Sequence, residues 1–484
     1  MNNESADVTT EKPKRIHDEA PSDLFANFMK SGWTPSSLGD LPPLEVVTYA
    51  FTRRQVLSEA FKGIRLVLPA GGYKVRANDT DYNYRPHSAY VYYSGVQGAD
   101  ATAEAVLVLE PSGDSHITYL YMNPRSTRDT DAFYRDAKYG ELWVGRRFTL
   151  DEAKARYQIE TRHLSELAAL LSDSKETLTL RSVDQLVDKS VKTHAREEEF
   201  ATFVSEQRLC KDEYEIAELQ AAVDASALGF NDVVAAIPAA VETPRGERVL
   251  DAAFYGRARI LGNDLGYNTI VGAGSHACVL HWIRNDGDVH RGELVLVDAG
   301  VEMQSFYTAD ITRTLPVDGK FSPAQRALYM LVYESQLAGF AAIKPGVLFP
   351  EINKACQEVL AKGLADMGVL TVSAEESLKP EVGLHRRWTL HGVSHHLGLD
   401  VHDCAQARKE MYLDAPLREG MVLTVEPGLY IQPDDELFAP EYRGIGIRIE
   451  DDVVVTADGC RNLSEDIPRH PDDIEKWMKQ ILGR

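Results

Sequence analysis

Residues 295–314 read VLVDAGVEMQSFYTADITRT and contain the two features on which the fold assignment depends. The first is an apolar run from Val295 to Val297, typical of a buried strand, that ends on the acidic residue Asp298. The second is a strand-like stretch that carries Asp310 where an apolar residue would be expected. A single acid at a strand end is usually a turn or capping residue, so neither carboxylate alone indicates a function.

Two strand-like segments nearer the C-terminus repeat this pattern. The segment LTVEPG carries Glu426, and the segment RGIGIRIE ends on Glu450. In the second segment, the two-residue period of a strand places Gly446, Arg448 and Glu450 on one face. Four acids are therefore flanked by residues that are typical of buried strands.

A histidine-rich segment adds imidazole groups to these acids. Residues 391–403 read HGVSHHLGLDVHD and contain four histidines. If four carboxylates converge in one low-dielectric pocket, their charges are prohibitive unless they are neutralised. Two divalent cations would offset four carboxylates, so we expect a two-metal site. Oxygen-rich ligation with one imidazole and no thiolate favours Mn²⁺, with Co²⁺ or Zn²⁺ as possible substitutes.

Composition argues against several other classes of protein. The 484 residues include 52 Lys and Arg against 74 Asp and Glu, a formal net charge of −22. This charge argues against nucleic-acid binding, which needs cations that displace phosphate counterions, and against anionic membrane surfaces. No apolar run approaches the roughly 18 residues that suggest a membrane span. The five scattered cysteines lack C-x-x-C spacing and predict reduced thiols in a cytoplasmic protein.

The chain is expected to consist of a tail and two domains. Residues 1–24 are polar, lack the apolar core of a secretory signal, and predict a flexible tail. Residues 25–204 alternate strand-like and helical stretches, which favours an α/β domain. Residues 205–484 predict a larger α+β domain in which helices and strands are segregated.

Hydrophobic periodicity and turn residues predict the individual elements. The expected strands cover residues 64–69, 89–94, 103–110, 293–298, 306–315, 421–425 and 445–455. Helical segments are expected over residues 149–171, in the linking stretch 181–208, and over 212–237, 322–345 and 351–367. Ser322 and Gln325 form a capping box at the start of one helix. A cluster of tyrosines is expected on a strand surface or interface: Tyr82, Tyr84, Tyr90, Tyr92 and Tyr93.

The acids and one histidine, in their local motifs, resemble the aminopeptidase P and prolidase branch of the pita-bread metallopeptidases, whose relatives include methionine aminopeptidase and creatinase. The family's metal motifs match, in the family's order, at Asp298, Asp310, His395, Glu426 and Glu450. The resemblance is strong over about residues 205–484 and less specific in the first half, around residues 84–95 and 143–147. It implies a C-terminal pita-bread domain preceded by a smaller α/β domain of the creatinase and prolidase type.

The resemblance also implies a role for each ligand. Asp310 and Glu450 would bridge two metals, and Asp298 would complete the coordination of one of them. His395 and Glu426 would complete the other. A metal-bridging hydroxide would be the nucleophile, because two cations lower the pKa of bound water, and Glu426 would handle its proton.

Four further residues are implied near the substrate. His281 and His402 match family histidines that contact the substrate and stabilise the tetrahedral intermediate. His391 matches a family position near the site, and Arg448 would orient the carboxylates. For His391 and Arg448, structural support is the alternative interpretation.

The resemblance implies a peptidase that acts on peptides with proline in second position. Aminopeptidase P removes the residue that precedes this proline, whereas prolidase splits only the Xaa-Pro dipeptide. The interval from His402 to Glu426 is short and lacks the longer insertion of prolidases, which favours an Xaa-Pro aminopeptidase over a dipeptidase. Non-catalytic binding modules of the same fold have lost several acidic ligands, whereas all five ligands are present here. The family also implies a homodimer or homotetramer.

One interval departs from the family's pattern. Asp298 and Asp310 are twelve positions apart, one more than expected for the most similar aminopeptidases P. The extra residue falls within Val301–Tyr307, which is expected to be a hairpin loop, where insertions are tolerated.

Overall fold

A mixed five-stranded sheet organises the first half of the chain, as seen in a computed structural model that describes residues 21–483. Its order is β6-β5-β4-β1-β7, and β1 (Arg65–Pro69), which lies between β4 and the edge strand β7, is buried at every position. β1 pairs antiparallel with β4 (Val106–Ser112) and parallel with β7 (Thr177–Thr179). Helices pack around this sheet, which confirms the expected mixture of strands and helices in the first half.

The remaining elements of the first half are short. The other strands are β2 (Val75–Ala77), β3 (Thr80–Asp81), β5 (Ser115–Met122) and β6 (Glu160–His163). The helices are α1 (Asp23–Lys30), α2 (Val46–Ala60), α3 (Ser88–Ser94), α4 (Ala132–Arg135), α5 (Glu141–Val144), α6 (Leu150–Tyr157), α7 (Leu167–Leu171), α8 (Gln185–Ser190) and α9 (Glu197–Glu206). Most of the expected tail lies outside the described residues, and its last two positions, Asp23 and Leu24, begin α1.

The expected strand over residues 89–94 is wrong, because this segment forms the helix α3. The His87 side chain accepts a hydrogen bond from the first turn, and Gly95 ends the helix in the left-handed region at φ 72°. Tyr92 and Tyr93 are buried, and their hydroxyls donate to Gln207 at 3.1 and 2.7 Å. The β-propensity of tyrosine is thus overridden by caps and tertiary packing, and these tyrosines belong to the core instead of a strand surface.

Two expected helical segments are divided. The helical segments expected over 149–171 are α6, which ends at Tyr157 where Gln158 adopts a left-handed conformation, and α7, and the edge strand β6, which was not expected, lies between them. The linking stretch 181–208 contains two helices, α8 and α9, separated by an irregular segment. Charged, helix-favouring composition therefore did not reveal where tertiary pairing interrupts a helix.

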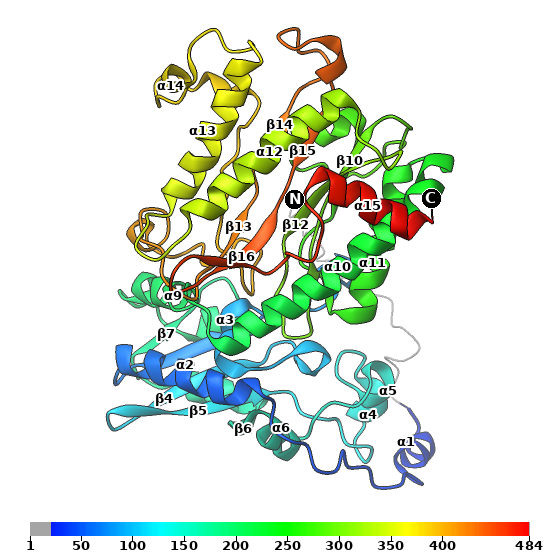
Figure 1. Cartoon of the computed structure of the whole chain (residues 1–484). Helices are drawn as coiled ribbons and strands as arrows, with labels where there is room; N and C mark the ends of the chain where they lie inside the picture. The colour runs from blue at the N-terminus through cyan, green and yellow to red at the C-terminus, as the bar shows by residue number, and fades with distance from the viewer. Residues whose placement is uncertain (1–20, 484) are drawn as a thin grey trace, which may run out of the picture.

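The second half contains two long helix pairs with strands between them. α10 (Glu213–Glu242) lies beside α11 (Gly246–Leu261), and α12 (Pro323–Ala342) lies beside α13 (Pro350–Asp366) (Figure 1). The capping box predicted for α12 is confirmed. The Ser322 hydroxyl accepts a hydrogen bond from the backbone N–H of Gln325, and the side-chain oxygen of Gln325 accepts one from the backbone N–H of Ser322. The segregation of helices and strands agrees with the expected α+β character.

The strands of the second half form several small sheets. They are β8 (Asp264–Leu265), β9 (Ile270–Ala273), β10 (Leu294–Ala299), β11 (Val301–Glu302), β12 (Ile311–Pro316), β13 (Val422–Val425), β14 (Gly428–Tyr430), β15 (Gly446–Arg448), β16 (Asp451–Val455) and β17 (Cys460–Asn462). Two short helices complete this half, α14 (Ala374–Ser377) and α15 (Pro471–Leu482). The sheet orders are β12-β10-β9, β13-β16-β17, β14-β15 and β11-β8.

Two of the expected strands have different limits. The stretch 306–315 becomes regular only at Ile311, because a turn precedes it in which Phe306 has a positive φ of 68°. The stretch 445–455 is split into β15 and β16, which pair with different partners, and Glu450 lies at the break. Both irregularities fall beside the acids that the sequence singled out.

Candidate metal centre

Strand pairing brings three acids from distant parts of the sequence to one place. Asp298 lies on β10 opposite Thr312 of β12, and Asp310 immediately precedes β12. The backbone N–H of Glu450 donates to the carbonyl of Thr312 at 3.1 Å, so the break between β15 and β16 lies against the same strand. All three acids are buried, with 7% or less of their surface exposed.

A second pairing places His395 beside Glu426. The N–H of His395 donates to the Thr424 hydroxyl at 3.1 Å, and the N–H of Thr424 donates back to the carbonyl of His395 at 3.0 Å. The N–H of Glu426 donates to Val393 at 2.9 Å. The Nδ1 of His395 bonds to the carbonyl of His396, which leaves its Nε2 free to face the acids.

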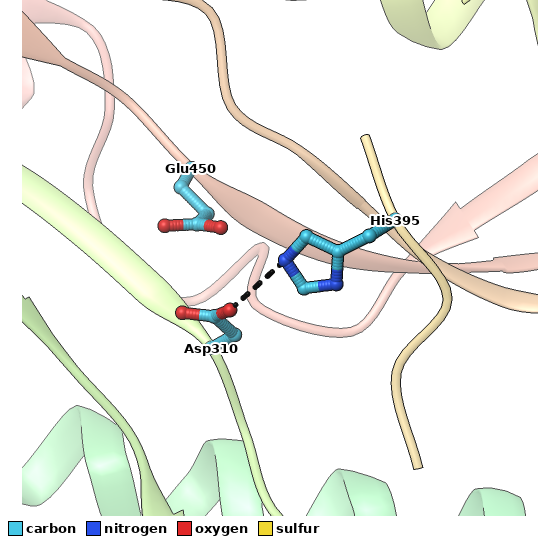
Figure 2. Close-up of side chains that lie close together, drawn as sticks. All are labelled: Asp310, His395 and Glu450. Carbon is cyan, nitrogen blue, oxygen red and sulfur yellow. Dashed lines mark ion pairs between the residues drawn. The ribbon is translucent and has the colours of Figure 1, made fainter. Parts of the chain in front are cut away.

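Asp310, His395 and Glu450 form the tightest cluster of candidate ligands, and Figure 2 shows their side chains pointing toward one another. One ligand atom from each lies within 4.8 Å of the other two. The His395 Nε2 lies 3.3 Å from Asp310 and 3.4 Å from Glu426. Asp298 lies outside this group of three, and its carboxylate is bound by Arg448 and by the Tyr267 hydroxyl, the latter at 2.6 Å.

One cavity of about 550 Å³ is lined by all nine residues that the sequence analysis proposed as metal ligands or as groups near the substrate. The candidate ligands Asp298, Asp310, His395, Glu426 and Glu450 line it together with His281, His391, His402 and Arg448. The His402 ring stacks edge-on against His395, with ring centroids 4.4 Å apart. The structure therefore brings together residues that are separated by up to 169 positions in the sequence.

The charges in this cavity are unbalanced. Burial raises the pKa of Glu450 well above its ordinary value, and the charges of Asp310, Glu426 and Asp298 raise it further. Burial likewise raises the pKa of Glu426 to about 7, although the charge of His395 opposes the shift. Among the described residues that line the cavity, Arg448 alone has a permanent positive charge. Four carboxylates with one imidazole are a donor set that fits hard divalent cations, which would offset this excess.

His391 and Arg448 are joined through a tyrosine that the sequence reasoning missed. The His391 Nε2 lies 2.7 Å from the Tyr430 hydroxyl, and Arg448 donates to the same hydroxyl at 3.1 Å. Burial, with a smaller effect of the Arg448 charge, lowers the pKa of His391 to about 4, so this imidazole is neutral near pH 7. Tyr430 follows Glu426 by only four residues, but nothing in its own motif indicated this contact.

Two further hydroxyls near the acids were also missed. Thr312 donates to Glu450 at 2.6 Å and accepts from the Arg448 Nε at 3.1 Å. It lies two residues after Asp310, so the strand period could have indicated a shared face. Tyr267, which donates to Asp298, lies in an irregular segment with no recognisable signal. Because these groups bond the outer atoms of the carboxylates, they restrict how the carboxylates can rotate.

A buried charge cluster supports the loop that carries His402. Asp403 is 1% exposed, and its carboxylate lies 2.9 Å from the Lys211 ammonium and 3.1 Å from the Arg208 guanidinium. Its backbone N–H donates to the carbonyl of His396 at 2.9 Å. The cluster therefore fixes the His402 loop against the start of the second half of the chain.

This cluster predicts a loss of stability in acid. Burial alone would raise the pKa of Asp403, but the charges of Arg208 and Lys211 outweigh it and lower the pKa from 3.8 to about 2. Because the pKa is lower in the folded state, the contribution is complete above about pH 4 and is lost as the pH falls toward 2. We expect this loss to be about 2 kcal/mol of unfolding free energy.

Thermal unfolding of the wild type and of Asp403→Asn between pH 6 and pH 2.5 measures this effect. The difference in melting temperature between the wild type and Asp403→Asn should be constant above pH 4 and should become smaller as the pH falls below 4. A difference that stays constant down to pH 2.5 would show that Asp403 does not titrate as expected.

No helix within residues 21–483 combines the length and apolar character that crossing a bilayer requires. All five cysteines lie in this range and are free thiols.

Comparison with known proteins finds two matching family models. The model of metallopeptidase family M24 matches residues 217–457, and the model of the aminopeptidase P N-terminal domain matches residues 50–180. Xaa-Pro aminopeptidase 1 of Streptomyces coelicolor is 48% identical over 96% of this chain and 93% of its own length. Xaa-Pro aminopeptidase of Escherichia coli is 34% identical over 88% of this chain and 96% of its own length. Among solved structures, aminopeptidase P from E. coli with the inhibitor Pro-Leu superposes with a TM-score of 0.79 at 31% identity, covering 91% of this chain and all of that chain.

Proposed function

The chain belongs to the Xaa-Pro aminopeptidases of metallopeptidase family M24, and on this premise we propose that it removes the N-terminal residue from peptides with proline in second position. The fold is accordingly a pita-bread domain preceded by an aminopeptidase P N-terminal domain. The observation that carries the proposal is the convergence of five candidate ligands and three further histidines on one cavity.

In this proposal, Asp298, Asp310, His395, Glu426 and Glu450 hold two divalent cations. When bound, such cations polarise the scissile carbonyl and lower the pKa of water into the working range. Manganese is the proposed ion, because its preference for oxygen ligands suits four carboxylates and one imidazole. Cobalt and zinc are the alternatives. The tight group of Asp310, His395 and Glu450 supports the proposed set of ligands.

The chain's own groups position the peptide and move the proton. Glu426, which lines the cavity beside His395, is proposed to accept the proton of the attacking water and to return it to the leaving group. His281 and His402, which line the cavity, are proposed to bind the substrate and to stabilise charge as the carbonyl becomes tetrahedral. His391 is neutral and bonded to Tyr430, so it presents a fixed ring beside the acids. Arg448 is proposed as a positioning residue, because it binds Asp298 and Thr312.

The finer organisation also belongs to this proposal. We divide the chain into the tail 1–24, an N-terminal domain 25–204 and a catalytic domain 205–484. The boundary falls in the last turn of α9, and the division is supported by the long helix α10, which starts soon after α9 ends. A homodimer or homotetramer is proposed from the family resemblance. A cytoplasmic location, without nucleic-acid or membrane partners, is supported by the net charge of −22 and the five free thiols.

A peptide series tests the activity. With the purified Mn²⁺-loaded protein, we expect hydrolysis of Ala-Pro-Ala and about 100-fold lower kcat/KM for Ala-Ala-Ala, since a pocket shaped for proline discriminates by about this factor. We expect the dipeptide Ala-Pro to be a poorer substrate than Ala-Pro-Ala. Cleavage of Ala-Pro without cleavage of Ala-Pro-Ala would instead identify an Xaa-Pro dipeptidase, and metal binding without any hydrolysis would identify a binding module.

A further inference from the structure

A second cavity lies directly beside the candidate metal centre. Its volume is about 490 Å³, and its walls come from α13, from the segment after α14, and from residues 383–392. His391 and Gly392 line both cavities, so the two cavities share a wall. None of the proposed metal ligands lines the second cavity, and the roles assigned so far leave it without a function.

The walls of the second cavity are predominantly basic. Its charged residues are Lys354, Glu358, Lys379 and Arg386. Lys354 pairs with Glu351 at 3.0 Å, and Lys379 pairs with Glu376, so acids outside the cavity already engage both ammonium groups. Arg386 is exposed and forms no ion pair with any residue in the described range 21–483. Its guanidinium is therefore available to an anionic ligand.

A buried amide in the same wall lacks a partner. Gln357 lines the cavity and is 7% exposed, and its Nε2 lies 3.3 Å from the Thr389 hydroxyl. Its Oε1 has no hydrogen-bond partner within the described part of the chain. An unpaired buried acceptor is costly, and a turn of this amide toward the cavity would let a backbone N–H of a bound chain satisfy it.

We propose that the second cavity binds the part of a peptide substrate that follows the proline, and that Arg386 favours an acidic side chain there. The inference rests on the proposed function, because it assumes that the reacting end of the peptide lies among the acids. Because His391 and Gly392 line both cavities, a peptide held among the acids can continue past them into the second cavity. We therefore take positions three to five, which follow the proline, as the candidates for contact with Arg386.

Matched peptides separate this inference from the activity itself. The probes are the amide of Ala-Pro-Ala and pentapeptide amides based on Ala-Pro-Ala-Ala-Ala, with Glu or Gln at position three, four or five, so that no probe carries a C-terminal carboxylate. Glu and Gln have the same shape, so the ratio of their kcat/KM values reports charge recognition alone. For the wild type we expect about a 2- to 5-fold preference for Glu at one of these positions, in line with exposed charge pairs.

Variants of Arg386 identify the source of this preference. Arg386→Gln should abolish the Glu preference and leave kcat/KM for the amide of Ala-Pro-Ala unchanged, whereas Arg386→Lys should retain part of the preference. Lys362→Gln is the matched control, because it removes an exposed cation of α13 that does not line the cavity.

The possible outcomes distinguish the two proposals. An absent Glu preference in the wild type, or a preference that survives in Arg386→Gln, would overturn the inference while hydrolysis of Ala-Pro-Ala upholds the activity. If the wild type fails to hydrolyse Ala-Pro-Ala, the proposed function fails and the inference fails with it. If Arg386→Gln lowered kcat/KM equally for the tripeptide and the pentapeptides, this would also contradict the proposal that the second cavity is a separate subsite.

Discussion

Replacing Glu450 with alanine is expected to remove bound metal and peptidase activity together. Glu450 is 2% exposed and shares a group of ligand atoms within 4.8 Å with Asp310 and His395, so its loss removes one side of the tightest cluster. We expect kcat/KM for Ala-Pro-Ala to fall by about 1,000-fold or more, since the loss of cation binding removes the main source of charge stabilisation. Metal content per chain and kcat/KM, measured on the same preparation, test this.

Two companion variants make the result specific. Glu450→Gln preserves volume and the contact with Thr312, so it separates the loss of charge from a packing defect. Glu441→Ala removes an exposed acid in the short helix Pro440–Tyr442 and should leave both metal content and activity unchanged. A Glu450→Ala protein that retained peptidase activity would contradict the proposed metal centre.

Replacing Asp403 with asparagine is expected to lower the free energy of unfolding more than any other substitution proposed for this protein. The Lys211 side chain is 0% exposed and the Arg208 side chain 9% exposed, so Asp403→Asn leaves two buried cations without their common anion. Breaking a buried ion pair in this way costs about 3–5 kcal/mol. Urea unfolding of the wild type and the variant at pH 7 measures the difference.

A neighbouring acid provides the control. Asp400 also pairs with Arg208, at 3.1 Å, but its side chain is 41% exposed. Asp400→Asn should therefore cost less than about 1 kcal/mol, as exposed pairs do. Similar small losses for both variants would show that the buried cluster does not stabilise the fold as its geometry indicates.

Several features of the fold could be predicted because their signals are local. The capping box at Ser322 and the long helix that starts after Asp212 depend on residues within a few positions of one another, and both are confirmed. The buried strand that ends on Asp298 is also confirmed as β10. The helix α3 was missed because its tyrosines favour strands, whereas the caps at His87 and Gly95 and contacts with distant residues such as Gln207 decide its conformation.

The sequence by itself singled out the four acids, which interrupt strand-like segments, and the histidine-rich segment 391–403; the family resemblance added the roles of His281, His391, His402 and Arg448. Only the tertiary structure decided how they meet. The pair of Arg448 with Asp298 spans 150 positions, and that of Lys211 with Asp403 spans 192. The second cavity, with Arg386 at its wall, is also assembled from separate elements. Local spacing cannot specify such contacts, because their free energy depends on which strands pair and on how completely packing excludes water from the charges.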